Sequence, residues 1–234
     1  MKISRTATNL IRFFIDECVP PVLRDSRLFM WLPLKLWFGE NSGSVFTFKD
    51  DLLRMSEAEL IRFYEELECS AVERETDLNA GCLREIQSCI VGDKVLEVGC
   101  GRGFLSSLLA EKYKVTACDF VDKPDFAAKN EFVFKRENVE KLSFDNDEFD
   151  TVVCAHTLEH VINISTAVSE LRRVAAKRLI IIVPKQRPYR YTPDLHIHFF
   201  PYAHSFLAAV GTRGVKCELH EIEGDWFYRE DFPV

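Results

Sequence analysis

The sequence lacks the usual marks of an exported or membrane-spanning protein. Its eight cysteines include no C-x-x-C pair, and several stand inside apolar, strand-like runs, so we expect reduced and buried thiols. The first residues, MKISRTA, form no long apolar segment, and the chain has no apolar run of about 18 residues, the length that spans a bilayer. We therefore expect a cytoplasmic protein without a signal peptide or an integral membrane segment.

An excess of positive charge is also missing. The 234 residues include 30 Lys and Arg against 37 Asp and Glu, which gives a formal net charge of −7 and a pI near 5.5. Such a chain has no basic field for a polyanion, so we expect no nucleic-acid partner. A local basic cluster at 185–190 is either a solvated loop or a grip for a single phosphate.

The most informative motif is a short apolar strand that runs into three glycines, V-L-E-V-G-C-G-R-G at residues 95–103. Glycines let the chain turn sharply and bring backbone N–H groups against a ligand that a Cβ atom would hold off. A helix is expected to follow from Phe104, and a second apolar strand, 114–119, ends on Asp119. An acidic residue at that position accepts hydrogen bonds from ribose hydroxyls in dinucleotide folds. The pattern therefore predicts a cofactor that contains a ribose.

Two details distinguish between ribose-containing cofactors. The nicotinamide fingerprint spaces its glycines G-x-G-x-x-G, whereas this loop reads G-x-G-x-G, and the chain has no Y-x-x-x-K pair of a short-chain dehydrogenase. Glu97 adds a carboxylate beside the loop, which favours a ligand with an ammonium or sulfonium group over a pyrophosphate. S-Adenosylmethionine has both cations, so it is the expected cofactor.

At these residues the chain resembles the class I S-adenosylmethionine-dependent methyltransferases, in particular the small-molecule members known as types 11 and 23. The resemblance extends over about residues 70–200 and rests on six motifs in the family's order: the glycine loop with Glu97, then Asp119, 137–139, 149–161, 170–174 and 179–184. It implies an α/β, Rossmann-like fold with a doubly wound, mostly parallel sheet and an antiparallel C-terminal hairpin. It also implies methyltransferase activity.

The family pattern implies a role for each matching residue. The glycine loop would hold the methionine part of the cofactor, Asp119 the ribose, and Asn138 with the backbone N–H of Val139 the adenine. The family more often has Asp where Asn138 stands, and an amide can still accept a hydrogen bond from the adenine amino group. Residues after the fourth strand would line the methionine end. The full set of expected cofactor contacts is Arg74, Glu97, Gly99, Cys100, Gly101, Gly103, Asp119, Phe120, Asn138, Val139, Ala155 and His156.

Candidate bases for the methyl acceptor come from two clusters. His160 lies just past the fourth strand, where related small-molecule methyltransferases use a histidine as base, and a cap or a core residue is the alternative. The second cluster follows the fifth strand. In an extended segment Asp194, His196 and His198 share one face. They would supply an acid–base pair, two metal ligands, a polar wall for the acceptor or plain structure. No third ligand is evident, and no metal is predicted.

Aromatic residues around the second cluster indicate the kind of acceptor. They would give an acceptor pocket stacking faces with polar tips, which suits a sugar ring, a phenol or a similar hydroxylated small molecule: Tyr189, Tyr191, Phe199, Phe200 and Tyr202. The predicted function is therefore O-methyl transfer to a small molecule, with N-methyl transfer left open. The alternatives are a non-catalytic binding protein of this fold and a nicotinamide-dependent dehydrogenase. The oligomeric state cannot be predicted.

The pattern divides the chain at about residue 90. A regular alternation in 91–234 predicts strands at 94–99, 114–119, 132–135, 149–154 and 178–183, helices at 103–112 and 164–174, and a final hairpin within 215–229. Residues 1–90 show no such rhythm and are expected to form a helical extension or lid. It would contain helices at 56–69 and 79–89.

Two features of this extension have open interpretations. The aromatic stretch 28–38 is either a buried lid or a membrane-surface anchor, and Pro33 favours the lid because it should break a long amphipathic helix. Arg74 either reaches the cofactor carboxylate or belongs to a helix start that Thr76 or Asp77 caps.

Overall fold

The chain forms two compact units. The computed structural model describes residues 10–11, 13–66, 75–122, 132–191, 194–212 and 216–233. The sheet unit comprises Glu75–Lys185 and His198–Val234, and the helical unit comprises Met1–Arg74 and Gln186–Ile197. Residues 75–90, which the sequence analysis places in the extension, group here with the sheet. Each unit is described by itself.

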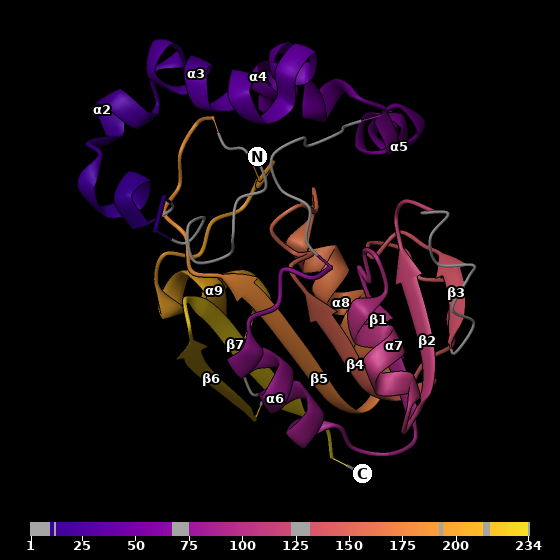
Figure 1. Cartoon of the computed structure of the whole chain (residues 1–234). Helices are drawn as coiled ribbons and strands as arrows, with labels where there is room; N and C mark the ends of the chain where they lie inside the picture. Colours follow the sequence, from indigo (N-terminus) through magenta and orange to yellow (C-terminus); the bar gives the residue numbers. More distant parts are fainter. Residues whose placement is uncertain are drawn as a thin grey trace. The chain divides into compact units, whose positions relative to one another are not determined.

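The sheet unit contains a seven-stranded sheet with the order β3-β2-β1-β4-β5-β7-β6 (Figure 1). Its strands are β1 (Lys94–Val98), β2 (Lys114–Asp119), β3 (Val133–Arg136), β4 (Phe149–Ala155), β5 (Ala175–Pro184), β6 (Cys217–Ile222) and β7 (Asp225–Asp231). Strands β1 to β5 run parallel to their neighbours among these five, while β7 is antiparallel to β5 and β6. The predicted mostly parallel, doubly wound sheet with a C-terminal hairpin is confirmed.

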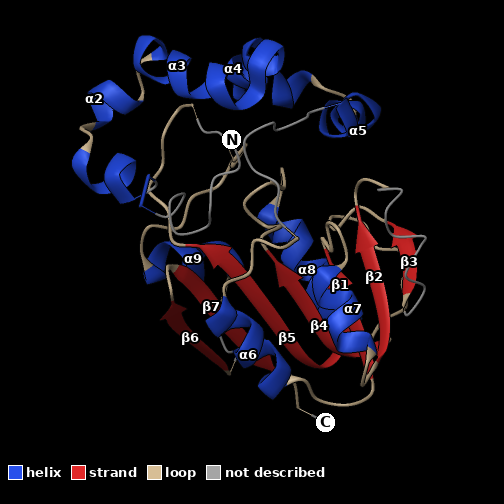
Figure 2. Cartoon of the chain, in the orientation of Figure 1, coloured by secondary structure: helices blue, strands red, loops and turns tan. Residues whose placement is uncertain are grey.

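Helices cover both faces of this sheet (Figure 2). Helices α6 (Ala80–Cys89) and α7 (Phe104–Ala110) pack on one apolar face, and α8 (Ile164–Val174) and α9 (Ala203–Val210) pack on the other. Helix α8 buries apolar residues at helical spacing, including Ile164, Val168 and Leu171, and the side chain of Asn163 caps its first turn. This layering explains why β5 is apolar without interruption from Leu179 to Pro184, where both of its faces are covered.

The start of α6 differs from the expected cap. The Asn79 side chain, rather than Thr76 or Asp77, accepts a hydrogen bond from the backbone N–H of Cys82 at 2.7 Å. Thr76 instead accepts a bond from the backbone N–H of Leu78, one turn before the helix begins. Asn79 is the residue directly before the first helical position, where a side-chain oxygen reaches the free N–H groups.

The helical unit is a succession of short helices. They are a π-helical turn (Phe14–Cys18), α2 (Pro21–Arg24), α3 (Arg27–Phe38), a 3₁₀ turn (Gly39–Asn41), α4 (Ser42–Asp51), a second 3₁₀ turn (Leu52–Arg54) and α5 (Glu57–Glu66). Within the described ranges, no helix is long and apolar enough to cross a bilayer.

Helix α3 contradicts the expectation that Pro33 breaks the aromatic stretch. The helix runs through Pro33 from Arg27 to Phe38. A proline inside a helix removes one hydrogen bond and crowds the preceding turn, at a cost of about 3 kcal/mol. Met30, Leu34 and Phe38 form a buried row along the helix, and burial of each such side chain stabilises the fold by about 1.5–3 kcal/mol, which offsets that cost.

The segment 186–197 packs into the helical unit through its backbone. Lys49 Nζ donates a hydrogen bond to the carbonyl oxygen of Tyr189 at 2.9 Å. Burial lowers the pKa of Lys49 to about 8, although the charges of Asp25 and Asp194 oppose this shift. The Tyr191 ring lies edge-on to Phe46, with 5.1 Å between the ring centroids.

Candidate functional site

Four loops of the sheet unit meet at one edge of the sheet. Strands β3, β2, β1 and β4 are adjacent and parallel, so the residues after Arg136, Asp119, Val98 and Ala155 all lie at the carboxyl edge. The strand order reverses between β1 and β4, because the chain moves outward to β3 and then returns to the other side of β1. In open α/β sheets this reversal point is where ligands bind.

The first glycine of the loop is required by a neighbouring side chain. Gly99 has a φ of 75°, and a Cβ atom at this position would collide with the hydroxyl of Thr157. That hydroxyl donates to the carbonyl oxygen of Ala155 at 3.1 Å. The N–H groups of Gly99 and Cys100 both donate to the carbonyl oxygen of Cys118, which ties the loop to β2.

The second glycine faces open space beside an acidic residue. A Cβ atom at Gly101 would meet no described atom within 4 Å, and the residue has a φ of 51°. Its N–H donates to Asp119 Oδ2 at 2.7 Å, while Asp119 Oδ1 accepts from the N–H of Val121 at 3.1 Å. A carboxylate has about four acceptor positions, so Asp119 can hold the loop and still accept from ribose hydroxyls. The arrangement fits a nucleoside cofactor.

Glu97 is buried below this loop. Its side chain is 4% exposed and accepts a hydrogen bond from the Ser106 hydroxyl of α7. Burial raises the pKa of Glu97 to about 8; the bond from Ser106 opposes the shift and the charge of Asp119 adds to it. Glu97 is therefore largely protonated at neutral pH in this structure, which the sequence analysis did not foresee.

A buried charge cluster follows β4. His156 has a φ of 51°, and its Nδ1 and Nε2 atoms lie 3.5 Å from Glu159 Oε1 and 3.5 Å from Asp225 Oδ2. Burial disfavours the charged imidazole, but Asp225 and Glu159 outweigh it and raise the pKa of His156 to about 10. His156 is therefore a cation at neutral pH, and it cannot act as a general base there.

Glu159 and Asp225 of this cluster, and Asn79 beside them, were not among the site residues that the sequence analysis predicted. Asp225 begins β7, and Asn79 Nδ2 donates to Asp225 Oδ2 at 2.8 Å and to the carbonyl oxygen of Ile222 at 2.9 Å. Both residues are almost fully buried. Asn79 could have been noticed as a cap directly before the helix, but no sequence signal links it to Asp225.

His160 and His198 lie in the sheet unit. His160 is part of the loop after β4, and His198 forms hydrogen bonds to that loop. The His160 backbone N–H donates to the carbonyl oxygen of Thr157 at 3.0 Å, which closes a turn. The backbone N–H of His198 donates to the carbonyl oxygen of Glu159, and its Nε2–H donates to that of Val161 at 2.8 Å. This proton placement favours a positioning role for His198, since Nε2 is already a donor.

The extended segment that was expected to place Asp194, His196 and His198 on one face does not form. Leu195 has a φ of 57°, a left-handed conformation that breaks the alternation of an extended strand. His196 Nδ1 donates to Gln186 Oε1, and Gln186 Nε2 donates to the hydroxyl of Tyr189 at 2.7 Å. His196 belongs to the helical unit, whereas His198 belongs to the sheet unit.

The predicted aromatic residues are divided between the two units. Tyr189 and Tyr191 are buried in the helical unit. Phe200 belongs to the core of the sheet unit, where its ring lies edge-on to Phe206 and its carbonyl oxygen accepts from the indole N–H of Trp226. Tyr202 is 51% exposed and is the N-cap residue directly before α9. The ring contacts described for them lie within each unit: Tyr191 with Phe46, Phe200 with Phe206 and Tyr202 with His204.

Most of the other predicted cofactor residues lie at the carboxyl edge of the sheet or next to it. Asn138 Oδ1 accepts from the N–H of Glu140, and Val139 beside it is buried. Cys100 is buried, which raises the pKa of its thiol. Gly103, Phe120 and Ala155 lie at the ends of the loop, of β2 and of β4. Arg74 lies outside the described residues.

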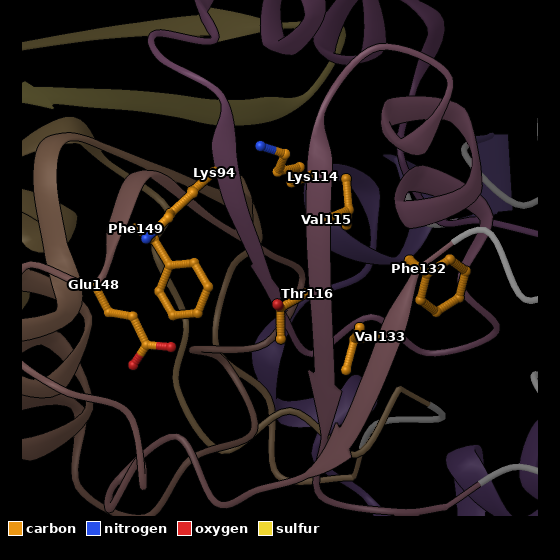
Figure 3. Close-up of a pocket in the computed structure, with 8 residues that line it drawn as sticks. All are labelled: Lys94, Lys114, Val115, Thr116, Phe132, Val133, Glu148 and Phe149. Atoms are coloured by element: carbon orange, nitrogen blue, oxygen red, sulfur yellow. The ribbon is translucent and has the colours of Figure 1, made fainter.

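A hollow at the opposite edge of the sheet is a different feature (Figure 3). Its lining comes from the beginnings of strands rather than their ends: Lys94, Lys114, Val115, Thr116, Phe132, Val133, Glu148 and Phe149. Lys114 is paired with Asp93, with 3.0 Å between Nζ and Oδ2. None of the predicted site residues lines this hollow, so it is not the predicted cofactor site.

Comparison with known proteins agrees with this geometry. Residues 96–183 match the methyltransferase domain family. The chain is 35% identical over 94 residues to a ubiquinone biosynthesis O-methyltransferase of Dechloromonas aromatica, which covers 36% of this chain and 40% of that protein. It is 28% identical over 175 residues to (S)-coclaurine N-methyltransferase of Thalictrum flavum, covering 68% of this chain and 44% of that protein. The chain thus spans less than half the length of these curated relatives.

Solved structures show the same fold. A putative methyltransferase of Bacillus halodurans superimposes with a TM-score of 0.52 at 15% identity, over 65% of this chain and 98% of that one. The matched region contains the glycine loop, Asp119 and the segment after β4. Residues 96–183 of the sheet unit therefore match a methyltransferase domain, in agreement with the class I S-adenosylmethionine-dependent methyltransferases that the sequence resembles.

Proposed function

We propose that this protein transfers the methyl group of S-adenosylmethionine to a hydroxyl group of a small molecule. The observation that supports this most is the open space at Gly101 beside the carboxylate of Asp119. It leaves room for a ribose at the reversal point of the sheet.

We assign the cofactor contacts to the carboxyl edge. Asp119 accepts from the ribose hydroxyls, Asn138 and the Val139 N–H meet the adenine, and Gly101 lies against the methionine part. The cluster after β4 contributes to the methionine end through charge. Glu159 and Asp225 together exceed the one positive charge of His156. A surplus of negative charge there favours a sulfonium, the group that supplies an already activated methyl.

The chemical class of the methyl acceptor is proposed from the names of the relatives and from the residues of this chain. One relative is named as an O-methyltransferase of ubiquinone biosynthesis and another as an N-methyltransferase of coclaurine, so both are named for small molecules. We propose that the methyl acceptor is a hydroxylated small molecule. We also propose that the protein acts in the cytoplasm. The described cysteines, seven in all, are free thiols, in keeping with a reducing compartment.

We propose His160 as the base that removes the acceptor proton. It follows the strand that ends at the methionine side, whereas His156 is held as a cation and His198 donates through Nε2. Methyl transfer is an in-line displacement, so a single aligned base is sufficient. His196, the remaining candidate, is hydrogen-bonded to Gln186 in the helical unit.

The test is a methyl-transfer assay on the full chain. Purified protein is incubated with S-adenosylmethionine labelled in its methyl group and with phenols, catechols, sugars and amines, and labelled products are identified by mass spectrometry. His160→Ala should lower turnover by about 10²- to 10⁴-fold at nearly unchanged cofactor affinity. His204→Ala, on the exposed side of α9, is the matched control. Labelled amines alone would contradict the acceptor assignment, and wild-type turnover in His160→Ala would contradict the base.

A further inference from the structure

Exposed apolar side chains are concentrated in the helical unit. Of the large apolar residues that the described ranges leave exposed, all but three belong to residues 10–53; the three are Val133, Ile162 and Tyr202. Single exposed apolar residues are ordinary on a protein surface, but a concentrated group marks a contact site. The surface of the helical unit therefore has the character of a binding surface.

Helix α3 is the centre of this surface. Its inner row, Met30, Leu34 and Phe38, is buried, while Leu28, Leu32 and Leu36 on the outer side are 87%, 55% and 70% exposed. Residues four apart lie on one side of a helix, so the three leucines form a continuous outer row. A helix that is apolar on both sides is normally buried on both sides.

Further exposed apolar residues adjoin the outer row in the sequence. Trp31 is 53% exposed, one turn from Leu28, and Phe29 is 38% exposed. On α2, Val22 is 79% exposed and Leu23 is 49% exposed. Tryptophan beside leucines is typical of helices that lie at the boundary between lipid headgroups and acyl chains.

The two charged residues within α3 are both cations, although Asp25 and Glu40 flank the helix at its two ends. Between Ser26 and Gly39 the charged residues are Arg27 and Lys35, both cations and both exposed. Lys35 is four residues from Trp31 and three from Leu32, so it lies on the outer side of α3. The sequence before Asp16 also contains Lys2, Arg5 and Arg12 and no acidic residue. In a chain with a net charge of −7, this grouping of cations favours an anionic partner.

These observations favour lipid over the other possible partners. A second copy of α3 would bring cations of the same sign together. The sheet unit offers, in its described part, only scattered exposed apolar residues. An anionic bilayer surface provides both an apolar phase for the leucines and negative charge for Lys35, whose aliphatic stem can reach upward to the headgroups.

We propose that α3 and α2 lie on a membrane surface, with Leu28, Leu32, Leu36 and Trp31 inserted among the lipids of an anionic bilayer. The continuity of α3 through Pro33 makes the outer row possible. The proposal is independent of the methyl-transfer chemistry.

The experiment is flotation of the full-length protein with vesicles of phosphatidylcholine alone or mixed with phosphatidylglycerol. The wild-type protein should float with the mixed vesicles and bind the neutral ones at least about tenfold more weakly, since each cation near the surface adds about 1 kcal/mol. The variant Leu28→Gln/Leu32→Gln/Leu36→Gln should lose at least about tenfold in binding. Leu53→Gln is the matched control, because Leu53 is 81% exposed in the same unit but outside α3.

Two further measurements complete the test. Circular dichroism checks that the triple variant keeps its helices, and tryptophan emission of the wild type should shift to shorter wavelength with mixed vesicles but not in Trp31→Phe. Absence of binding, equal binding to both vesicle types, or wild-type binding by the triple variant would overturn the proposal. So would a dimer in sedimentation that the triple variant abolishes while no vesicle binds.

Discussion

Gly99 and Gly101 both have a left-handed backbone, but Gly99 is packed against Thr157 whereas Gly101 faces open space. We therefore expect Gly99 to matter for stability and Gly101 for cofactor binding. Gly99→Ala should destabilise the fold by roughly 2–5 kcal/mol, because the new methyl group meets Thr157 and the conformation is strained. Gly101→Ala should cost only about 1–2 kcal/mol of stability, while it weakens binding of S-adenosylhomocysteine. Urea denaturation and calorimetry measure the two effects. Equal losses of stability would contradict the distinction, and Thr157→Ala should partly rescue only Gly99→Ala.

We expect the carboxyl group of Glu97 to release a proton when the cofactor binds. Its pKa of about 8 leaves it mostly protonated at pH 7, and a neighbouring cation lowers that pKa. Affinity for S-adenosylmethionine should therefore rise with pH and level off above pH 8. Calorimetry at pH 7 in buffers of different ionisation enthalpy counts the protons. Glu97→Gln is the control, and the same proton release in that variant would contradict the assignment.

His156 gives a second pH dependence, with a different window. Its pKa of about 10 lies above the ordinary value of 6.5, so the stabilisation is fully present below pH 6.5 and is lost as the pH rises through 10. The free energy of unfolding of the wild type relative to His156→Gln should shrink between pH 7 and pH 10.5 in urea titrations. A difference that stays constant would show that the imidazole is not charged.

At the scale of elements, Arg172 joins two helices to the final hairpin. From α8 it donates to both oxygens of Glu230 on β7 and to the carbonyl oxygens of Val210 and Gly211 at the end of α9. Glu230 is only 1% exposed. Arg172→Met should therefore destabilise the protein by about 3–5 kcal/mol, because it leaves a buried charge unpaired. Arg172→Met/Glu230→Gln should recover part of the loss in thermal unfolding, and no recovery would argue against this cause.

The elements differ in how well the sequence predicts them. Helix α8, predicted at 164–174, runs from Ile164 to Val174, because its apolar spacing and its packing agree. Helix α3 was expected to break at Pro33. It continues because Met30, Leu34 and Phe38 are buried along one side of the helix, and the sequence alone does not show which of its many apolar residues are buried. The contact of Asn79 with Asp225 depends on where the hairpin returns, which no local pattern specifies.

At the scale of the whole molecule, the site residues fall into two groups. Those at the carboxyl edge, such as Asp119 and Gly101, could be predicted because parallel strands bring their ends to one edge. Asp194, His196 and His198 were expected to act together on one face. The left-handed Leu195 breaks the extended backbone, and Gln186 donates to Asp194 and accepts from His196; no local pattern in the sequence specifies these features.

The central claim is that the carboxyl edge binds S-adenosylmethionine through Asp119. Calorimetric titration of the full chain with S-adenosylhomocysteine tests it most directly. Asp119→Ala should bind more weakly by about 1.5–3 kcal/mol, the worth of a hydrogen bond to a charged group, or roughly 10- to 100-fold. The wild type should bind NAD more weakly than S-adenosylhomocysteine. If the wild type binds S-adenosylhomocysteine no better than Asp119→Ala does, or prefers NAD, the account is contradicted.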